Sequence, residues 1–288
     1  TVSREGLASL APVIARITAR AVQPLPGEYA GMMVRLDGAE PHDRTPVTDP
    51  ATDPLSPGKP RFNYYSLEVV QRIGYDSFCP DNGVLMAMNT DGEGSNGFNC
   101  FNWVIDAHPE DINMVDYVKP DGEKVMRTVA DYRQLNDALF HAGLNSGSEF
   151  EYVDTHNRLH FYIIDIHRNE QEILSYTVGV RSLDSDVVRE PVTVSAGKAA
   201  QKIAGEGIVE FAVSGDDLCR LYAVVTGDGW EVKLFNEIVA PGDGKTVKVP
   251  VYVRAKQGCS KKAEITFSAV SESDSKYRSA ASIKVKLQ

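Results

Sequence analysis

Residues 62–70 have the sequence FNYYSLEVV, and two further apolar runs follow, VLMAM at 84–88 and WVIDAHP at 103–109. Each run is too short for a typical helix and is rich in β-branched and aromatic residues, which favours buried or half-buried strands. Turn-rich loops that carry Cys79 and Cys100 separate the runs. The stretch from Phe62 to Tyr117 therefore predicts a mainly β protein.

The sequence around this stretch predicts a β-rich, sandwich-like domain at residues 1–183. Ser3 can cap a short helix that ends near Ser9. Thr128 can cap one main helix at about 128–142, because apolar residues recur there at helical spacing and Gly143 can end it. Further strands are expected where apolar and polar residues alternate, at 13–22, 32–36, 150–153, 159–165 and 173–183.

The sequence changes character at residues 184–196, where charged residues and Pro191 suggest a linker. Beyond the linker, short strands with alternating polarity are separated by Gly-Asp, Pro-Gly and Ser-rich turns. These strands are expected at 208–213, 221–226, 230–234, 246–253, 263–271 and 281–287. Their regular spacing is typical of an immunoglobulin-like β-sandwich, which we expect at residues 197–288.

The charge of the chain limits its partners. The formal net charge is −10, and binding to nucleic-acid phosphates needs clustered Lys and Arg, so DNA and RNA are not expected as partners. No apolar run approaches the ~20 residues that span a bilayer. The sequence starts at Thr1 without Met or a signal peptide, and we expect a processed or trimmed product.

Four cysteines stand at positions 79, 100, 219 and 259, without any C-x-x-C pair. The simplest pairing is local, with disulfides Cys79–Cys100 and Cys219–Cys259, each inside one expected domain. Both disulfides would indicate an oxidising compartment and therefore a secreted, extracellular protein. Free buried thiols are the alternative.

Several acidic and histidine side chains are candidate metal ligands. Asp91 and Glu93 lie in a glycine-rich loop that only loosely resembles a calcium loop, because the distal bidentate Glu is missing. Asp106 and His108 would project from one face of a strand, where they could hold a metal, orient a base or form a structural pair before a turn. His156 and His160 have the spacing of a zinc helix but lie in an expected turn and strand.

Aromatic residues of the first domain are candidates for ligand binding. Tyr64, Tyr65 and Trp103 lie in the apolar runs, near Asp and Asn residues. Aromatic rings beside polar groups can bind sugars, whereas core packing is the commoner use of such residues in strands. Both interpretations stay open at this point.

Four sequence blocks support a family resemblance. They are SREGL at 3–7, VVQRIGYDSF at 69–78, WVIDAHPEDI at 103–112 and DYRQLNDALFHAG at 131–143. In this order they resemble the region C-terminal to the catalytic domain in secreted M6-type metallopeptidase-like proteins, the relatives of the immune inhibitor A group. The resemblance covers residues 1–183, and the remainder resembles the Ig-like module often attached to such proteins.

The resemblance implies zinc-dependent peptide hydrolysis for the family, with zinc ligands and a general base on an H-E-x-x-H helix. That motif is absent from these 288 residues, so no catalytic residue is carried over, and zinc is expected only in a separate catalytic domain. The resemblance therefore implies the non-catalytic C-terminal portion of a secreted M6-like zinc metallopeptidase, which supports substrate or surface binding. Its expected partners are the catalytic chain of the same precursor, a protein substrate or a glycan.

Two alternatives remain open. The chain could be a stand-alone, secreted carbohydrate-binding protein that uses the aromatic loops at 62–103. It could also be a hydrolase with an unrecognised site near Asp106 and His108, so enzymatic activity of the chain itself stays undecided. A structural calcium ion is a further hypothesis.

Overall fold

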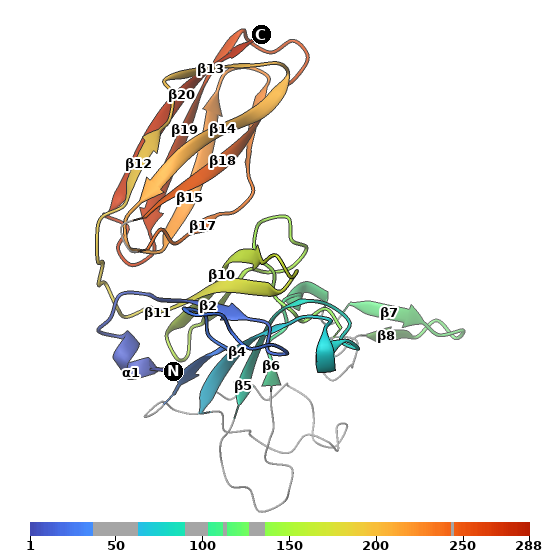
Figure 1. The fold of residues 1–288 in the computed structure, drawn as a ribbon. Helices are drawn as coiled ribbons and strands as arrows, with labels where there is room; N and C mark the ends of the chain where they lie inside the picture. Colours follow the sequence, from blue (N-terminus) through green and yellow to red (C-terminus); the bar gives the residue numbers. More distant parts are fainter. Residues whose placement is uncertain (37–62, 90–102, 112–113, 127–135, 243–244) are drawn as a thin grey trace, which may run out of the picture. The chain divides into compact units, whose positions relative to one another are not determined.

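The computed structural model describes residues 1–36, 63–89, 103–111, 114–126, 136–242 and 245–288 (Figure 1). The chain divides into two compact units. Unit 1 comprises Thr1–Ala8, Ala15–His141 and Gly147–Ser182, and unit 2 comprises Ser9–Ile14, Ala142–Ser146 and Leu183–Gln288. Both units consist mainly of β-strands, which confirms the predicted fold class at that level.

Two sheets and a hairpin make up the described part of unit 1. One sheet has the order β1 (Val2–Ser3), β3 (Met32–Arg35), β4 (Tyr64–Val70), β5 (Gly83–Asn89) and β6 (Trp103–Val104). The other has the order β2 (Val13–Thr18), β11 (Leu174–Ser182), β10 (Leu159–Arg168) and β9 (Glu151–Asp154). The hairpin pairs β7 (Val115–Val118) with β8 (Lys124–Met126). The strands predicted from alternating polarity are therefore present.

The helices of unit 1 are short. Ser3 caps α1 (Arg4–Leu7), and its hydroxyl oxygen accepts a hydrogen bond from the Gly6 amide at 3.0 Å, as the sequence predicts. Two 3₁₀ turns, η1 (Gly74–Asp76) and η2 (Pro109–Asp111), connect strands. No helix within the described ranges is long and apolar enough to cross a membrane.

The helix predicted at about 128–142 is wrong for its C-terminal part, and residues 127–135 lie outside the described residues. Residues 136–142 form a turn followed by extended chain. Phe140 and Val84 exchange both backbone hydrogen bonds, at 2.9 and 3.0 Å, in an antiparallel bridge. Leu139 and Phe140 are buried, so the apolar pattern does mark a core segment, but tertiary pairing with β5 replaces the helical hydrogen bonds.

The core of unit 1 lies between its two sheets. Tyr65 of β4 and Phe161 of β10 are completely buried, and their ring centroids are 4.9 Å apart. The Tyr65 hydroxyl donates a hydrogen bond to the carboxylate of Asp154, at the end of β9. This contact places Tyr65 and Phe161 on the faces of β4 and β10 that meet in the core.

Unit 2 also contains two sheets within its described residues. The first has the order β12 (Thr193–Ala196), β14 (Glu206–Ser214), β18 (Thr246–Ala255) and β16 (Trp230–Leu234). The second has the order β13 (Ala200–Ile203), β20 (Arg278–Leu287), β19 (Lys262–Ser271), β15 (Cys219–Thr226) and β17 (Ile238–Val239). Phe211 and Phe267 stack at 4.8 Å in the core. All six predicted strands are present, and β12 lies within the segment expected to be a linker.

The predicted disulfide Cys219–Cys259 is wrong, because both residues are free thiols. Cys219 pairs with Ser271 at one end of the β15–β19 ladder. Cys259 lies beyond the other end, where its backbone would contact a Cβ added at Gly229. Seven residues of strand correspond to roughly 23 Å, whereas a disulfide needs Cα atoms within about 7 Å. Cys79 is also free, and its expected partner Cys100 lies outside the described residues.

Candidate functional site at His108

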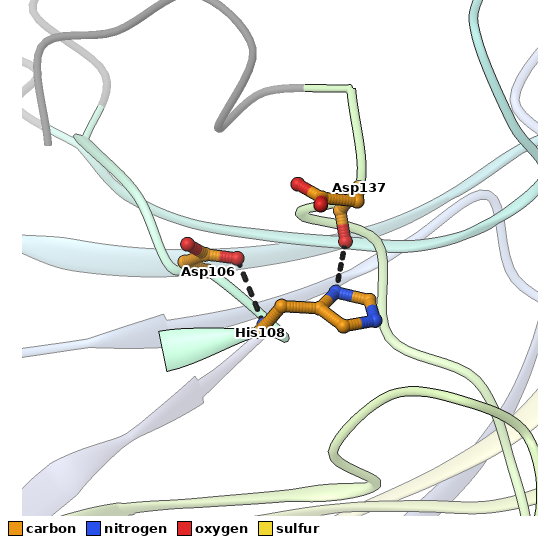
Figure 2. A group of neighbouring side chains, drawn as sticks. All are labelled: Asp106, His108 and Asp137. Atoms are coloured by element: carbon orange, nitrogen blue, oxygen red, sulfur yellow. Dashed lines mark hydrogen bonds between the residues drawn. The ribbon is translucent and has the colours of Figure 1, made fainter. Parts of the chain in front are cut away.

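The polar cluster around His108 forms where the chain leaves β6. After β6, the Ile105 amide still donates to the Met86 carbonyl of β5. Asp106 then begins a turn in which its Oδ1 accepts a hydrogen bond from the His108 amide at 2.8 Å, as Figure 2 shows. The next residue, Pro109, starts η2. The prediction that both side chains project from one face of a strand is therefore wrong, because β6 ends at Val104 and the two residues are joined by a hydrogen bond within a turn.

Two distant segments meet the imidazole ring of His108. Its Nδ1 atom lies 2.5 Å from the backbone carbonyl oxygen of Asp137 (Figure 2). Its Nε2 atom lies 2.6 Å from the backbone carbonyl oxygen of Gly147. A carbonyl oxygen only accepts hydrogen bonds, so each contact requires an N–H on the ring. The geometry therefore matches the doubly protonated imidazolium form of His108.

The surroundings of His108 favour its protonated form. Burial by itself lowers the pKa of His108, but hydrogen bonds to the carbonyls of Gly147 and Asp137 raise it. The negative charges of Asp137 and Glu110 raise it further, and the net result is a pKa above the usual value of 6.5. The folded chain thus binds a proton at His108 more tightly than an exposed histidine does.

The pKa of Asp106 is raised, which favours the neutral, protonated form of its carboxyl group. Burial raises the pKa of Asp106 above its usual value, and the charges of Asp111 and Asp137 add to the effect. The hydrogen bond from the His108 amide opposes it. Three carboxyl groups and one imidazole therefore share a small region in which each charge depends on the others.

We tested whether this cluster fits a metal ion. Ligand atoms of Asp106, His108 and Asp137 lie within 4.8 Å of one another. The buried Oδ2 of Asp106 and Oδ1 of Asp137 have no hydrogen-bond partner within the described ranges. However, a zinc-binding histidine needs a nitrogen lone pair, whereas both ring nitrogens here face carbonyl oxygens. The residues therefore do not fit a catalytic zinc, and the imidazolium already supplies a positive charge beside the carboxylates.

The other candidate residues do not gather around this cluster. Asp91 and Glu93 lie outside the described residues. Tyr64 and Tyr65 are neighbours in β4 and so face opposite sides of the sheet, and Tyr65 has no exposed surface with which to contact a sugar. Trp103 lies in β6.

The histidines at 156 and 160 are separated as the sequence predicts. His156 lies in the turn before β10, and His160 lies within that strand. The Nε2 atom of His160 is 2.8 Å from Glu151 Oε2, and its Nδ1 atom is 2.7 Å from the Tyr162 hydroxyl. His160 therefore belongs to a hydrogen-bonded chain on the four-stranded sheet.

Sequence reasoning missed Asp137 and Gly147 as partners of His108. Asp137 falls within the helix predicted at about 128–142, and Gly147 lies 39 residues from His108 in sequence. Both residues contribute backbone carbonyl groups, which every residue carries. For Gly147 the sequence therefore holds no side-chain signal, whereas the Asp137 carboxylate, which also raises the pKa of His108, is a signal that could have identified its segment.

Two family models match this chain. A family model described as a middle domain matches residues 1–183, and one described as a Peptidase M6-like domain matches residues 190–287. The expected link to M6-type peptidases is thus found, but on the second part of the chain.

A curated relative from Arthroderma benhamiae, described as "Putative secreted metallopeptidase", is 39% identical over 306 residues. The match covers 95% of this chain and 42% of the relative, so the chain spans less than half the length of that protein. Because the match over residues 1–183 covers more than half of the sequence, the chain belongs to the family that this middle domain defines, here joined to a Peptidase M6-like domain.

Proposed function

We propose that this chain is a non-catalytic portion of a secreted M6-like zinc metallopeptidase and that it binds substrate or a surface for that enzyme. The relative's description supports the peptidase context and the extracellular location. Cys219 and Cys259 are free thiols and Cys100 lies outside the described residues, so the proposed location is argued from the relative.

The chemistry of the chain supports a non-catalytic role. The H-E-x-x-H motif is absent from the full sequence. The His108 cluster does not offer the three protein ligands and open position that a catalytic zinc needs. Catalysis by the longer protein would then depend on residues outside this chain.

The observation that carries the binding role is the exposed apolar surface of the β7–β8 hairpin. The hairpin extends away from the two sheets of unit 1 (Figure 1). Its exposed apolar side chains are Met114, Val115, Tyr117, Val118 and Met126. Tyr117 and Val118 are 55% and 56% exposed, and clustered exposure of this kind is typical of interaction sites. An unfolded protein substrate could add a strand to such a hairpin.

The binding role can be tested with fluorescein-labelled casein as an unfolded protein substrate. Anisotropy titration should show saturable binding to the intact chain. The double variant Tyr117→Ser, Val118→Ser should weaken binding on the order of tenfold, because it removes the central apolar contacts. Tyr222→Ser, a change of an exposed tyrosine in unit 2, should leave binding unchanged. Unsaturable binding, or equal loss in both variants, would contradict the proposal.

The non-catalytic role has a separate test. The purified chain, incubated with casein and zinc, should release no peptides beyond a buffer blank. Peptide release that a chelator abolishes, and that added zinc restores, would show that the chain is itself a metallopeptidase. The hydrolase alternative near Asp106 and His108 predicts that His108→Gln removes any such activity.

We also infer that unit 2 is an immunoglobulin-like sandwich. If β12, β14, β15, β16, β18, β19 and β20 are strands A to G, the two sheets have the orders ABED and GFC. The short β13 pairs in parallel with β20, and β17 adds an edge beside β15. Solution of the unit at atomic resolution by crystallography would test the assignment, because a different strand order would exclude it.

Carbohydrate binding is the second candidate, favoured by an exposed aromatic pair at η1. Tyr75 is 62% exposed and Phe78 is 85% exposed. The Tyr75 hydroxyl donates to the Arg20 carbonyl oxygen at 2.5 Å, which orients the ring while leaving it accessible. A glycan array would test this function: selective binding that Phe78→Ser abolishes supports it, and an array without selective signals removes it.

A further inference from the structure

We propose that His108 is a pH-operated latch, which holds two distant segments of unit 1 to the Asp106–His108 turn and releases one of them when the imidazole loses a proton. The proposal concerns unit 1 alone and does not depend on the proposed function.

The latch joins three segments that are far apart in sequence. The imidazole contacts the carbonyl oxygens of Asp137 and Gly147. The backbone of Ala107 bridges the same segments, since its amide donates to Ala138 at 3.3 Å and its carbonyl accepts from the Glu149 amide at 2.9 Å. The His108 side chain and the Ala107 backbone therefore join the same three segments in one junction, at residues 106–108, 137–138 and 147–149.

Loss of a proton is incompatible with both ring contacts at once. A neutral imidazole carries one N–H and one nitrogen lone pair. At 2.5 or 2.6 Å, the lone pair would face the lone pairs of a carbonyl oxygen, and that contact must open. Deprotonation therefore frees the segment at Asp137 or the segment at Gly147, and the Ala107 contacts to that segment weaken with it.

Several titratable groups lie on the segments around the His108 ring. Asp106 lies on the same turn, Glu110 lies in η2, and Asp137 lies on the segment before the Phe140 bridge. On the Gly147 segment, the Ser148 hydroxyl accepts from the His141 amide, and His141 Nε2 lies 3.1 Å from Asp81 Oδ2. The exposed Glu149 completes this segment. Of these groups, the carboxylates of Asp137, Glu110 and Asp106 interact favourably with a positive charge on His108.

The sign of the pH dependence follows from this geometry. The pKa of His108 is raised in the folded chain above 6.5. Its contribution to the closed junction is therefore complete below pH 6.5 and is lost as the pH rises through the folded pKa. Each unit of difference between the closed and open pKa changes the opening equilibrium about tenfold. Burial and the charges of Asp111 and Asp137 raise the pKa of Asp106 above its usual value of 3.8, so this carboxyl keeps its proton to a higher pH than an exposed aspartate does.

The junction lies at the base of the exposed hairpin. The His108 carbonyl accepts from the Asp111 amide at 3.2 Å, and the Asp111 carbonyl accepts from the Met114 amide at 3.3 Å. Strand β7 begins at Val115, the next residue.

Hydrogen exchange of the whole chain between pH 5.5 and 8.5 tests the latch. After correction for intrinsic exchange, opening at the amides of Ala107, His141 and Glu149 should rise with pH, towards about tenfold per unit of pKa difference. His108→Gln keeps a donor but cannot titrate, so its opening should not depend on pH. His156→Gln, a change in the β9–β10 turn, should keep the wild-type response.

A second measurement uses only the wild-type chain, so its result does not depend on whether the His108→Gln variant folds. An NMR titration of the histidine ring signals should show His108 titrating above pH 6.5, with both ring nitrogens protonated at the acidic end. A His108 signal that titrates at or below 6.5 would overturn the latch. Equal pH dependence in the wild-type chain and His108→Gln would overturn it as well.

Discussion

At the scale of single residues, buried charges of unit 1 are matched by specific partners. Asp76 is almost completely buried, and its two carboxylate oxygens accept hydrogen bonds from Nε and Nη2 of Arg20 at 2.9 and 2.8 Å. Arg20 also contacts Glu68 at 3.1 Å. The Arg20 guanidinium lowers the pKa of Asp76, although burial opposes the shift. The Arg20–Asp76 pair thus has the opposite pH dependence to the His108 contacts. It needs a deprotonated carboxylate, whereas the His108 contacts need a protonated ring.

Arg20→Met should destabilise the chain by about 3 kcal/mol, because it leaves a buried carboxylate without its cation. Urea unfolding at pH 7 would measure the loss. Since the folded pKa of Asp76 is depressed, the effect should be present above pH 3.8 and fade as the pH falls through the folded pKa. Arg168→Met, which removes an exposed pair with Glu172, is the matched control and should cost at most about 1 kcal/mol. Equal losses would refute the argument.

The cysteines give a second prediction at this scale. Burial raises the pKa of the Cys219 thiol to about 12, so it should resist a thiolate-directed reagent such as DTNB in the folded chain. Cys259 is only half-buried and should react before Cys219. Both should react after unfolding in urea without any reductant. If these two residues react only after a reductant is added, a disulfide joins them and the prediction of free thiols is wrong.

At the scale of elements, β5 and the segment at Leu139–Phe140 pack against each other at Gly83. A Cβ added to Gly83 would lie 2.9 Å from both the Leu139 Cβ and the Phe140 carbonyl oxygen. Neither atom is the end of a flexible side chain. The absence of a side chain at Gly83 therefore allows the Val84–Phe140 bridge to form, and this bridge holds the chain that carries Asp137.

Gly83→Ala should lower the free energy of unfolding by about 1–3 kcal/mol through overpacking. Thermal unfolding measured by circular dichroism would report the change. Gly197→Ala is a suitable control, because an added Cβ there meets no atom within 4 Å. A Gly83→Ala variant as stable as the control would show that the Phe140 segment moves away at little cost.

At the scale of the whole molecule, unit 2 has a core of its own. The buried cluster around Phe211 and Phe267 draws its members from Val192 to Val285. Residues of both sheets belong to this cluster, so the apolar faces of the two sheets are buried by side chains of unit 2 itself. Burial of a large side chain contributes about 1.5–3 kcal/mol, so a core of this extent can support a folded state.

Residues 190–288 produced alone should therefore unfold cooperatively in urea, with Trp230 fluorescence as the probe. Phe267→Ala should reduce the stability of this segment by about 3–5 kcal/mol, because it removes one ring of the stacked pair and leaves a cavity. Tyr222→Ala, at an exposed position of β15, should have little effect. A segment that shows no cooperative transition would mean that its core is incomplete without the rest of the chain.

The sequence alone predicted the longer strands between Val13 and Leu287 and the Ser3 cap, because alternating polarity and capping act between neighbours in the chain. It did not predict the short strands β7, β8, β12, β13 and β17. It also showed that H-E-x-x-H is absent. Only the tertiary structure decided that Phe140 pairs with Val84 instead of continuing a helix, and that Cys219 and Cys259 lie at opposite ends of a sheet. It alone placed two carbonyl groups on His108, since backbone carbonyls are common to all residues and only folding selects which of them meet a side chain.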